Sequence, residues 1–342
     1  MIRIEDIKFD EDHYDLIIQF LTKKTGLKLK YYRNKHIEKR IKSRMIRVNC
    51  FEFESYYRYL LENPTESDKF LLSFNINYST FFRNWEVYEQ LEDLILKSVN
   101  YNRADVISDL HPNPERKYRK KSKRKSHKIE DTTNKKKLEH RLKNKLSAEK
   151  FFTQSILYKK LKDFPRFKQP INIWSCPCAN GEEPYSLTII IDNLKKQIPQ
   201  FPEFKIVASD IDENAIKRAK IGIYNEESTK NISRYFEKNY FVRKKAGFGF
   251  QYKLIEEIKD NIEFFEEDVM KGHQTSLVYD VIFCRYLLIY INKAVRRKFL
   301  KILENRLNVG GLLFLGKTET IFSSQSNLKL VDSLNRIYMK IN

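Results

Sequence analysis

Residues 176–186, Cys-Pro-Cys-Ala-Asn-Gly-Glu-Glu-Pro-Tyr-Ser, form the stretch whose residue types are best suited to bind a charged ligand. Apolar runs on either side, Ile171–Trp174 and Leu187–Ile191, predict a strand, a tight loop and a helix, the order that builds a nucleotide pocket. A dinucleotide site places the backbone amides of such a loop against pyrophosphate, whereas Glu182 and Glu183 would repel it here. The loop therefore favours a cationic ligand without phosphate, such as S-adenosylmethionine, over NAD.

The elements that must position this loop form a regular alternation of predicted strands and helices. Strands are predicted over 204–209, 261–265 and 280–285, and this alternation is typical of an α/β fold with a mostly parallel sheet. Residues 231–263 are aromatic and basic, and they predict an inserted small antiparallel β-subdomain. We therefore predict a Rossmann-like class I methyltransferase sheet in a domain over 151–342.

The N-terminal part of the chain predicts a small all-helical domain over 1–76. Its basic helix, at about 32–48, has apolar residues on one face. The basic face of this helix is either solvated or a surface for an acidic partner. A linker helix is predicted within 77–101, with Ser79 or Thr80 as its cap. The apolar face of the basic helix holds Ile37, Ile41, Met45 and Val48, and the other positions include Arg33, Lys35, Lys39, Arg40, Lys42, Arg44 and Arg47.

Residues 102–150 separate these predicted domains and are strongly basic. The stretch 114–150 holds 16 Lys or Arg and five Asp or Glu, in a chain whose net charge is +20. Because charge blocks of this kind usually stay solvated, we predict a flexible insertion. Contact with nucleic acid or a membrane surface through 114–150 is the less favoured interpretation.

The cysteines and the apolar runs bear on the cellular compartment. Four cysteines in 342 residues predict no disulfide framework. Cys176 and Cys178 have no companion pair at zinc-ligand spacing, so we expect no metal site. There is no N-terminal signal pattern, and no apolar run approaches the ~18 residues of a membrane-spanning helix. These features predict a protein of the reducing cytoplasm.

Several long motifs, in matching order along the chain, resemble the CheR-type family of chemotaxis receptor methyltransferases. That family has a Thr-x-Phe-Phe-Arg linker motif, a donor loop ending in Gly-Glu-Glu-Pro-Tyr-Ser, a second strand ending in Ala-Ser-Asp-Ile-Asp, and a fourth ending in Phe-Cys-Arg-Asn with a tyrosine downstream. The resemblance covers nearly all of the chain outside about 102–160. The corresponding segments are Ser79–Arg83, Gly181–Ser186, Ala208–Asp212, Phe283–Tyr286 and Tyr290.

The resemblance implies a two-domain, S-adenosylmethionine-dependent protein-glutamate O-methyltransferase. It would methylate glutamates on the cytoplasmic signalling helices of chemoreceptors, giving glutamate methyl esters for sensory adaptation and releasing S-adenosylhomocysteine. The basic helix at about 32–48 would lie against the acidic receptor helices. The β-subdomain at about 231–263 binds a receptor's C-terminal peptide in some members, by strand addition. We expect a monomer.

The resemblance also implies the roles of individual residues. Arg83 would orient the attacking glutamate, whose carboxyl, with an ordinary pKa of about 4.3, needs no general base near neutral pH; the alternative is a surface arginine. Tyr290 would contact the substrate or the methyl group, or else fill the core. Asp210 would accept from ribose hydroxyls, or else cap a helix. The implied donor-binding residues are Asn77, Ser79, Arg83, Glu183, Asp210, Asp268, Val269, Arg285 and Tyr286.

Three departures from the family pattern leave other activities open. Tyr286 replaces the family's asparagine, Lys317-Thr318-Glu319 stands in place of His-Ser-Glu, and Cys178–Asn180 replaces a stretch of smaller residues. The alternative interpretations are a related methyltransferase acting on another protein or on a polyanion such as RNA, and a donor-binding regulatory module.

Overall fold

The computed structural model describes residues 3–74, 79–99, 151–164, 169–247, 249–271, 277–321 and 326–342. The chain divides into two compact units, one of residues 1–77 with 287–299 and the other of residues 78–286 with 300–342. The basic insertion predicted over 102–150 falls outside the described residues. Within the ranges described, no helix is both long enough and apolar enough to cross a membrane.

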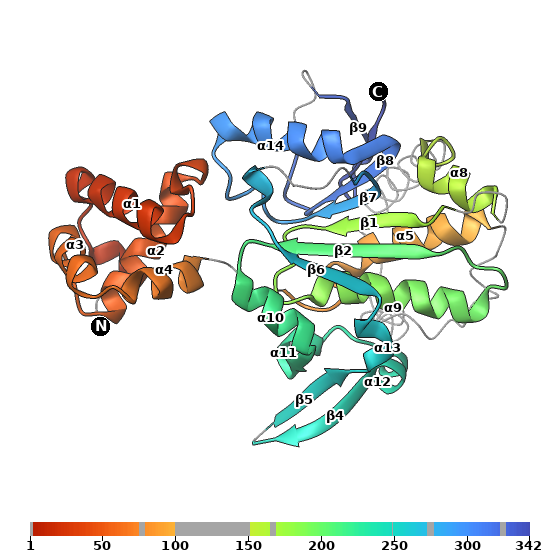
Figure 1. Cartoon of the computed structure of the whole chain (residues 1–342), viewed down its shortest axis with the longest axis horizontal. Coiled ribbons are helices and arrows are strands. Elements are labelled where there is room, and N and C mark those ends of the chain that lie inside the picture. Colours follow the sequence, from red (N-terminus) through yellow and green to blue (C-terminus); the bar gives the residue numbers. More distant parts are fainter. Residues whose placement is uncertain are drawn as a thin grey trace, which may run out of the picture. The chain divides into compact units, whose positions relative to one another are not determined.

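The N-terminal unit is a bundle of four α-helices, as predicted (Figure 1). The first, α1, begins after Asp10, whose carboxylate accepts from the His13 N–H, and it ends at Gly26, which has φ +70°. Its buried face meets buried faces of the other helices to form a small apolar core. The helices are α1 (Glu11–Thr25), α2 (Asn34–Arg47), α3 (Phe53–Glu62) and α4 (Glu66–Phe74), with short 3₁₀ turns at Ile4–Asp6 and Leu29–Tyr31.

The basic helix α2 carries fewer solvated charges than the sequence suggested. Lys42 and Arg44, expected among its surface cations, are buried. Lys42 pairs with Glu38 at 2.8 Å, and the Arg44 guanidinium binds both carboxylate oxygens of Glu66 at 2.8 and 2.7 Å. The expectation that the cations of this helix lie on its solvated face was wrong at these two positions, because both side chains are buried in the bundle. The exposed cations that remain are Arg33, Lys35, Lys39 and Arg47.

Residues 287–299 belong to the N-terminal unit although they lie far along the chain. The Arg33 N–H donates to the Tyr290 carbonyl and the Asn292 N–H donates to the Tyr31 carbonyl, both at 2.8 Å. The Tyr290 ring lies 4.7 Å from the His36 ring, centroid to centroid. Helix α14 (Lys293–Arg306) begins in this unit and ends in the other.

The second unit contains a seven-stranded sheet with the order β6-β2-β1-β7-β8-β10-β9. All neighbouring pairs are parallel except those of β10, which is antiparallel to β8 and β9. This confirms the predicted α/β class, although the sequence patterns did not reveal β9. The strands are β1 (Ile171–Ser175), β2 (Phe204–Asp210), β6 (Ile262–Glu266), β7 (Tyr279–Cys284), β8 (Leu307–Leu315), β9 (Leu328–Asp332) and β10 (Ile337–Lys340).

The topology of this sheet marks where a ligand is expected. The central strand β1 has β2 and then β6 on one side, and β7 and then β8 on the other, so the strand order reverses at β1. Ser175 of β1 is in register with Phe283 of β7. Ligands of open α/β sheets bind outside the carboxyl ends of the strands at such a reversal. The segments that follow β1 and β7 therefore form the candidate site. Apart from the short helices of the β-subdomain, the described helices of this unit are α5 (Trp85–Ser98), α8 (Ile156–Lys162), α9 (Glu182–Gln197), α10 (Glu213–Ile221) and the later part of α14.

The predicted antiparallel β-subdomain is a three-stranded sheet with the order β3-β5-β4. It begins earlier than expected, at β3 (Ile223–Asn225), and it includes short helices. Figure 1 shows β4 and β5 as a ribbon next to α11, α12 and α13. The remaining elements are β4 (Phe241–Ala246), β5 (Gly249–Leu254), α11 (Glu226–Thr229), α12 (Arg234–Tyr240), α13 (Glu256–Lys259) and the 3₁₀ turn Val269–Lys271.

Candidate active site

The loop after β1 is held against both neighbouring strands. The Cys176 N–H donates to the Phe283 carbonyl at the end of β7, and the Cys178 N–H donates to the Ser209 carbonyl near the end of β2, each at 2.9 Å. Gly181 then turns the chain into α9 with φ +93°. These contacts place Glu182 and Glu183, the first two residues of α9, beside the carboxyl ends of the central strands.

Glu183 lies at the centre of a buried hydrogen-bond network. Its carboxylate accepts from the Ser175 hydroxyl at 2.8 Å and from Arg285 Nη1 at 3.0 Å. The Arg285 side chain is only 2% exposed, so this ion pair is shielded from solvent. Because a buried charge is costly unless paired, the pair holds the first turn of α9 against the end of β7.

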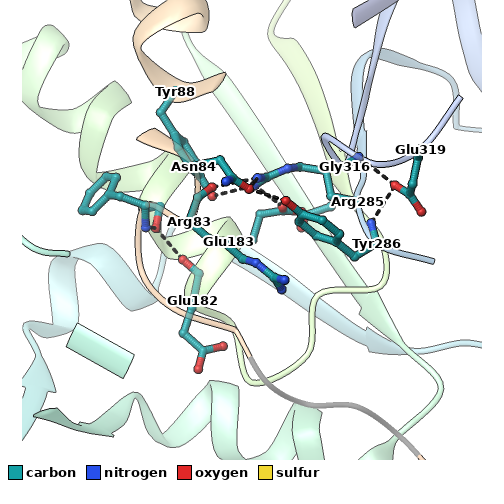
Figure 2. Close-up of polar contacts among 12 residues, drawn as sticks. Arg83, Asn84, Tyr88, Glu182, Glu183, Arg285, Tyr286, Gly316 and Glu319 are labelled. Atoms are coloured by element: carbon teal, nitrogen blue, oxygen red, sulfur yellow. Dashed lines mark hydrogen bonds and ion pairs between the residues drawn. The ribbon is translucent and has the colours of Figure 1, made fainter. Parts of the chain in front are cut away.

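Arg285 also binds the linker segment that precedes α5. Its Nη2 donates to the Arg83 carbonyl at 2.7 Å and to Asn84 Oδ1 at 3.0 Å, and its Nη1 lies 3.4 Å from the Tyr88 hydroxyl (Figure 2). One guanidinium group thus joins residues 176–186, the predicted donor loop, to the end of β7 and the linker. This arrangement brings together segments that are about two hundred residues apart in the chain.

Asn84, rather than Ser79 or Thr80, is the residue that precedes the first turn of α5. It has φ +59°, and its side chain makes no capping hydrogen bond to the helix. Instead its Oδ1 accepts from Arg285 and from the Tyr286 hydroxyl. The predicted cap was wrong, and the side chain that stands at the cap position is used by the site.

The Arg83 side chain lies over the ring of Tyr286. The Cζ of Arg83 is 3.9 Å from the ring centroid, which is close cation–π stacking (Figure 2). Tyr286 has φ +63°, and its N–H donates to Glu319 Oε2 at 2.7 Å. The same Glu319 oxygen accepts from the Gly316 N–H at 2.7 Å. The residue that departs from the family's asparagine therefore contacts the arginine expected to act on the substrate.

Glu182 is more buried than a helix N-terminal charge needs to be, with 1% of its surface exposed. Its Oε1 accepts from the Ser228 hydroxyl at 3.3 Å, and its Oε2 accepts no hydrogen bond from the described residues. Burial raises the pKa of this carboxyl to about 7, against the weaker lowering effect of hydrogen bonds from its own backbone and from Ser228.

Asp210 ends β2 and is buried. Its carboxylate accepts from the Ala179 N–H at 2.8 Å and from the Asp212 N–H at 3.0 Å, so it also braces the donor loop. Burial raises its pKa to about 6, although these backbone hydrogen bonds lower it. Its carbonyl accepts from the Glu267 N–H at 2.8 Å, which brings the segment after β6 alongside. In that segment Asp268 Oδ1 accepts from the Met270 N–H, and Val269 is buried.

The structure brings most of the predicted site residues together, and three lie elsewhere or are not described. Arg83, Glu183, Arg285 and Tyr286 form one network, and the residues at the ends of β2 and β6 lie along the same edge of the sheet. Ser79 is partly buried in the linker, and Tyr290 lies in the N-terminal unit. Asn77 is outside the described residues. Sequence reasoning missed four residues that complete the network, namely Ser175, Asn84, Tyr88 and Glu319.

Comparison with known proteins gives matches to two family domains and to individual relatives. The SAM-binding domain of the CheR methyltransferases matches residues 140–337, more than half of the chain, and their all-alpha domain matches residues 12–74. Chemotaxis protein methyltransferase 2 of Vibrio cholerae is 34% identical over 172 residues, which cover 49% of this chain and 58% of the relative. The chemotaxis protein methyltransferase of Vibrio anguillarum is 30% identical over 166 residues, covering 48% and 59%.

A longer but weaker match is the chemotaxis protein methyltransferase of Listeria innocua, 22% identical over 320 residues that cover 94% of this chain and 93% of the relative. In the two Vibrio proteins the match spans less than two thirds of the relative's length. Among solved structures, TehB from Haemophilus influenzae is 16% identical and covers 45% of this chain and 38% of TehB, with a TM-score of 0.26, too low to compare sites. Since both domain profiles match, and one covers more than half of the sequence, the chain belongs to the CheR methyltransferase family.

Proposed function

We propose that this protein transfers the methyl group of S-adenosylmethionine to glutamate side chains on the cytoplasmic helices of chemoreceptors, producing glutamate methyl esters. The observation that carries the proposal is the buried Arg285–Glu183 pair, which ties the donor loop to the Arg83 segment. The similar proteins named as chemotaxis protein methyltransferases support it.

The side chains around the loop suit a cationic donor. Glu182, Glu183 and Asp210 are buried carboxylates at the carboxyl ends of β1 and β2 or at the start of α9, and one oxygen of Glu182 lacks a partner among the described residues. Glu183 would hold the ammonium group, and Asp210 would accept from the ribose hydroxyls. Asp268 and Val269 would flank the adenine. Ser79 and Asn77 would close the site from the linker, and Arg285 and Tyr286 would line it.

When bound, the donor supplies an electrophilic methyl group on a sulfonium. The receptor glutamate attacks as a carboxylate, so that its new O–CH3 bond forms as the S–CH3 bond breaks, and no proton is transferred. Arg83 would hold one carboxylate oxygen and leave the other to attack. The protein then acts chiefly by orientation and by removing water from the carboxylate. Tyr290 would contribute a hydrogen bond to the substrate.

The receptor surface implied by this chemistry is acidic. Exposed cations at four positions of the α2 segment, Arg33, Lys35, Lys39 and Arg47, would attract it and raise the rate of encounter. Steering of this kind weakens as salt screens the charges, so KM for the receptor should rise with ionic strength more steeply than the donor Kd does.

Methyl transfer to purified receptor signalling domains from labelled S-adenosylmethionine tests the proposal. We expect label that is released as methanol in mild alkali and that maps to glutamates by mass spectrometry. Arg83→Ala should abolish turnover and leave binding of S-adenosylhomocysteine within about threefold, because it removes an acceptor contact. Alkali-stable label, or full activity of Arg83→Ala, would contradict the proposal.

A further inference from the structure

We propose that Tyr286 is a positioning residue that fixes the plane of the Arg83 guanidinium, and that Glu319 holds Tyr286 in the backbone conformation this requires. The proposal rests on the proposed function for the role of Arg83 in orienting a carboxylate. The stacking itself is a separate claim and has its own measurement below.

The contacts of the Tyr286 ring restrain it on several sides. The Arg83 Cζ lies 3.9 Å from its centroid, and its hydroxyl donates to Asn84 Oδ1. That oxygen also accepts from Arg285 Nη2 at 3.0 Å, so the ring is tied to the buried ion pair with Glu183. A ring held in this way forms a fixed platform for a guanidinium group (Figure 2).

The backbone beneath the ring is built to hold an unfavourable conformation. Tyr286 has φ +63°, which is uncommon for an aromatic residue and persists only where the surroundings impose it. Glu319, which is 2% exposed, accepts from the N–H groups of both Tyr286 and Gly316, each at 2.7 Å. A Cβ at Gly316 would lie 2.8 Å from both Glu319 Oε2 and Tyr286 Cδ1, so only glycine allows the ring this close.

A platform of this kind has a direct chemical consequence. Stacking covers one face of the guanidinium and limits its rotation, so that its N–H groups donate in a defined plane. Arginine binds carboxylates edge-on in that plane. The orientation of the acceptor carboxylate toward the methyl group would therefore depend on Tyr286 through its contact with Arg83, separately from the place that the proposed function gives Tyr286 in the lining of the donor site.

The test compares Tyr286→Asn with Tyr286→Phe. Asparagine tolerates positive φ but has no ring, whereas phenylalanine keeps the ring and loses only the hydroxyl. For receptor methylation we expect Tyr286→Asn to lower kcat about three- to thirtyfold, the range that a lost cation–π contact allows. Tyr286→Phe should lower kcat less than Tyr286→Asn does, and in Tyr286→Asn the fall in kcat should exceed the rise in the Kd of S-adenosylhomocysteine, measured by titration calorimetry.

A second measurement follows Arg83 directly and needs no turnover. In the ¹⁵N-arginine-labelled full-length protein, the ring current of Tyr286 should displace the Arg83 Nε–Hε resonance, which Arg83→Lys identifies by its loss. Tyr286→Asn and Glu319→Ala should move this resonance toward the ordinary arginine range. Tyr286→Phe and Glu319→Gln should leave it in place, since the Gln carbonyl can still accept from both N–H groups.

The outcomes separate the two claims. An unmoved Arg83 resonance in Tyr286→Asn, or a donor Kd that weakens as much as kcat falls, would overturn the positioning role. If no receptor is methylated by the wild-type protein while the resonance still depends on the Tyr286 ring, the stacking stands and the proposed function fails.

Discussion

Arg285 Nη1 lies 3.0 Å from Glu183 Oε2, and this buried ion pair is the point at which the donor loop and the linker meet. The same guanidinium binds the Arg83 carbonyl and Asn84 Oδ1. One side chain therefore connects the loop to the Arg83 segment. A ligand whose cationic group competes with Arg285 for Glu183 would act on both at once.

The Glu183→Gln variant tests this relationship. It keeps the shape of the side chain but removes the charge that pairs with Arg285 and that, in the proposed function, would also hold the donor's ammonium. We expect the Kd of S-adenosylhomocysteine to rise about ten- to a hundredfold, because a hydrogen bond to a charged group contributes ~1.5–3 kcal/mol. Titration calorimetry measures this directly. The matched control is Glu213→Gln on the surface of α10, which should change the Kd less than about twofold. Equal binding by wild type and Glu183→Gln would rule out a direct role.

How far the sequence predicts this site can be judged residue by residue. Glu183 and Asp210 were placed correctly at the sheet edge because a strand–loop–helix pattern specifies which residues follow each strand. Asn84 and Glu319 were missed because their importance depends on segments that meet only in the folded chain. No local pattern encodes such pairings.

The N-terminal helices show the same limit in a different form. The periodicity of α2 predicted its apolar face, and Ile37, Ile41 and Met45 are fully buried. It could not identify Arg44 as buried, because the carboxylate that compensates its charge comes from Glu66, at the start of another helix. Charge patterns reveal buried pairs poorly, since the partner lies in a different element.

The buried Glu182 predicts a pH dependence of stability. Its pKa is raised from 4.5 to about 7, so the folded state binds this proton more tightly than the unfolded state does. The stabilisation is complete below about pH 4.5 and is lost as the pH rises through 7. Relative to Glu182→Gln, the wild-type free energy of unfolding should fall by about 3 kcal/mol across this window. Urea denaturation at about pH 5 and about pH 8 measures the difference. A difference between the two proteins that does not change with pH would contradict the prediction.

Gly181→Ala should disrupt the donor loop by crowding as well as by backbone strain. A Cβ there would lie 2.9 Å from the Ala219 Cβ and 3.0 Å from the Tyr224 hydroxyl, at φ +93°. Gly26→Ala is the matched control, since Gly26 has φ +70° and a Cβ added there would meet no heavy atom within 4 Å. We expect the control to cost about 1–2 kcal/mol of unfolding free energy through strain alone. Gly181→Ala should cost more and should also weaken S-adenosylhomocysteine binding, which the control should not. Equal losses in both variants would show that crowding at the loop is relieved.

The last prediction concerns the buried pair that joins α2 to α4. The Arg44 guanidinium makes two hydrogen bonds to Glu66, which also accepts from the Tyr56 hydroxyl at 3.1 Å. Glu66→Ala leaves the arginine charge buried without its partner and should lower the free energy of unfolding by about 3–5 kcal/mol. The double variant Arg44→Met with Glu66→Leu should recover part of this loss, because apolar residues of similar volume replace buried pairs at little cost, while the Tyr56 hydroxyl still loses its acceptor. Thermal unfolding followed by circular dichroism compares the three proteins. A double variant as unstable as Glu66→Ala would mean that the shape of the pair, rather than its charge balance, stabilises the N-terminal unit.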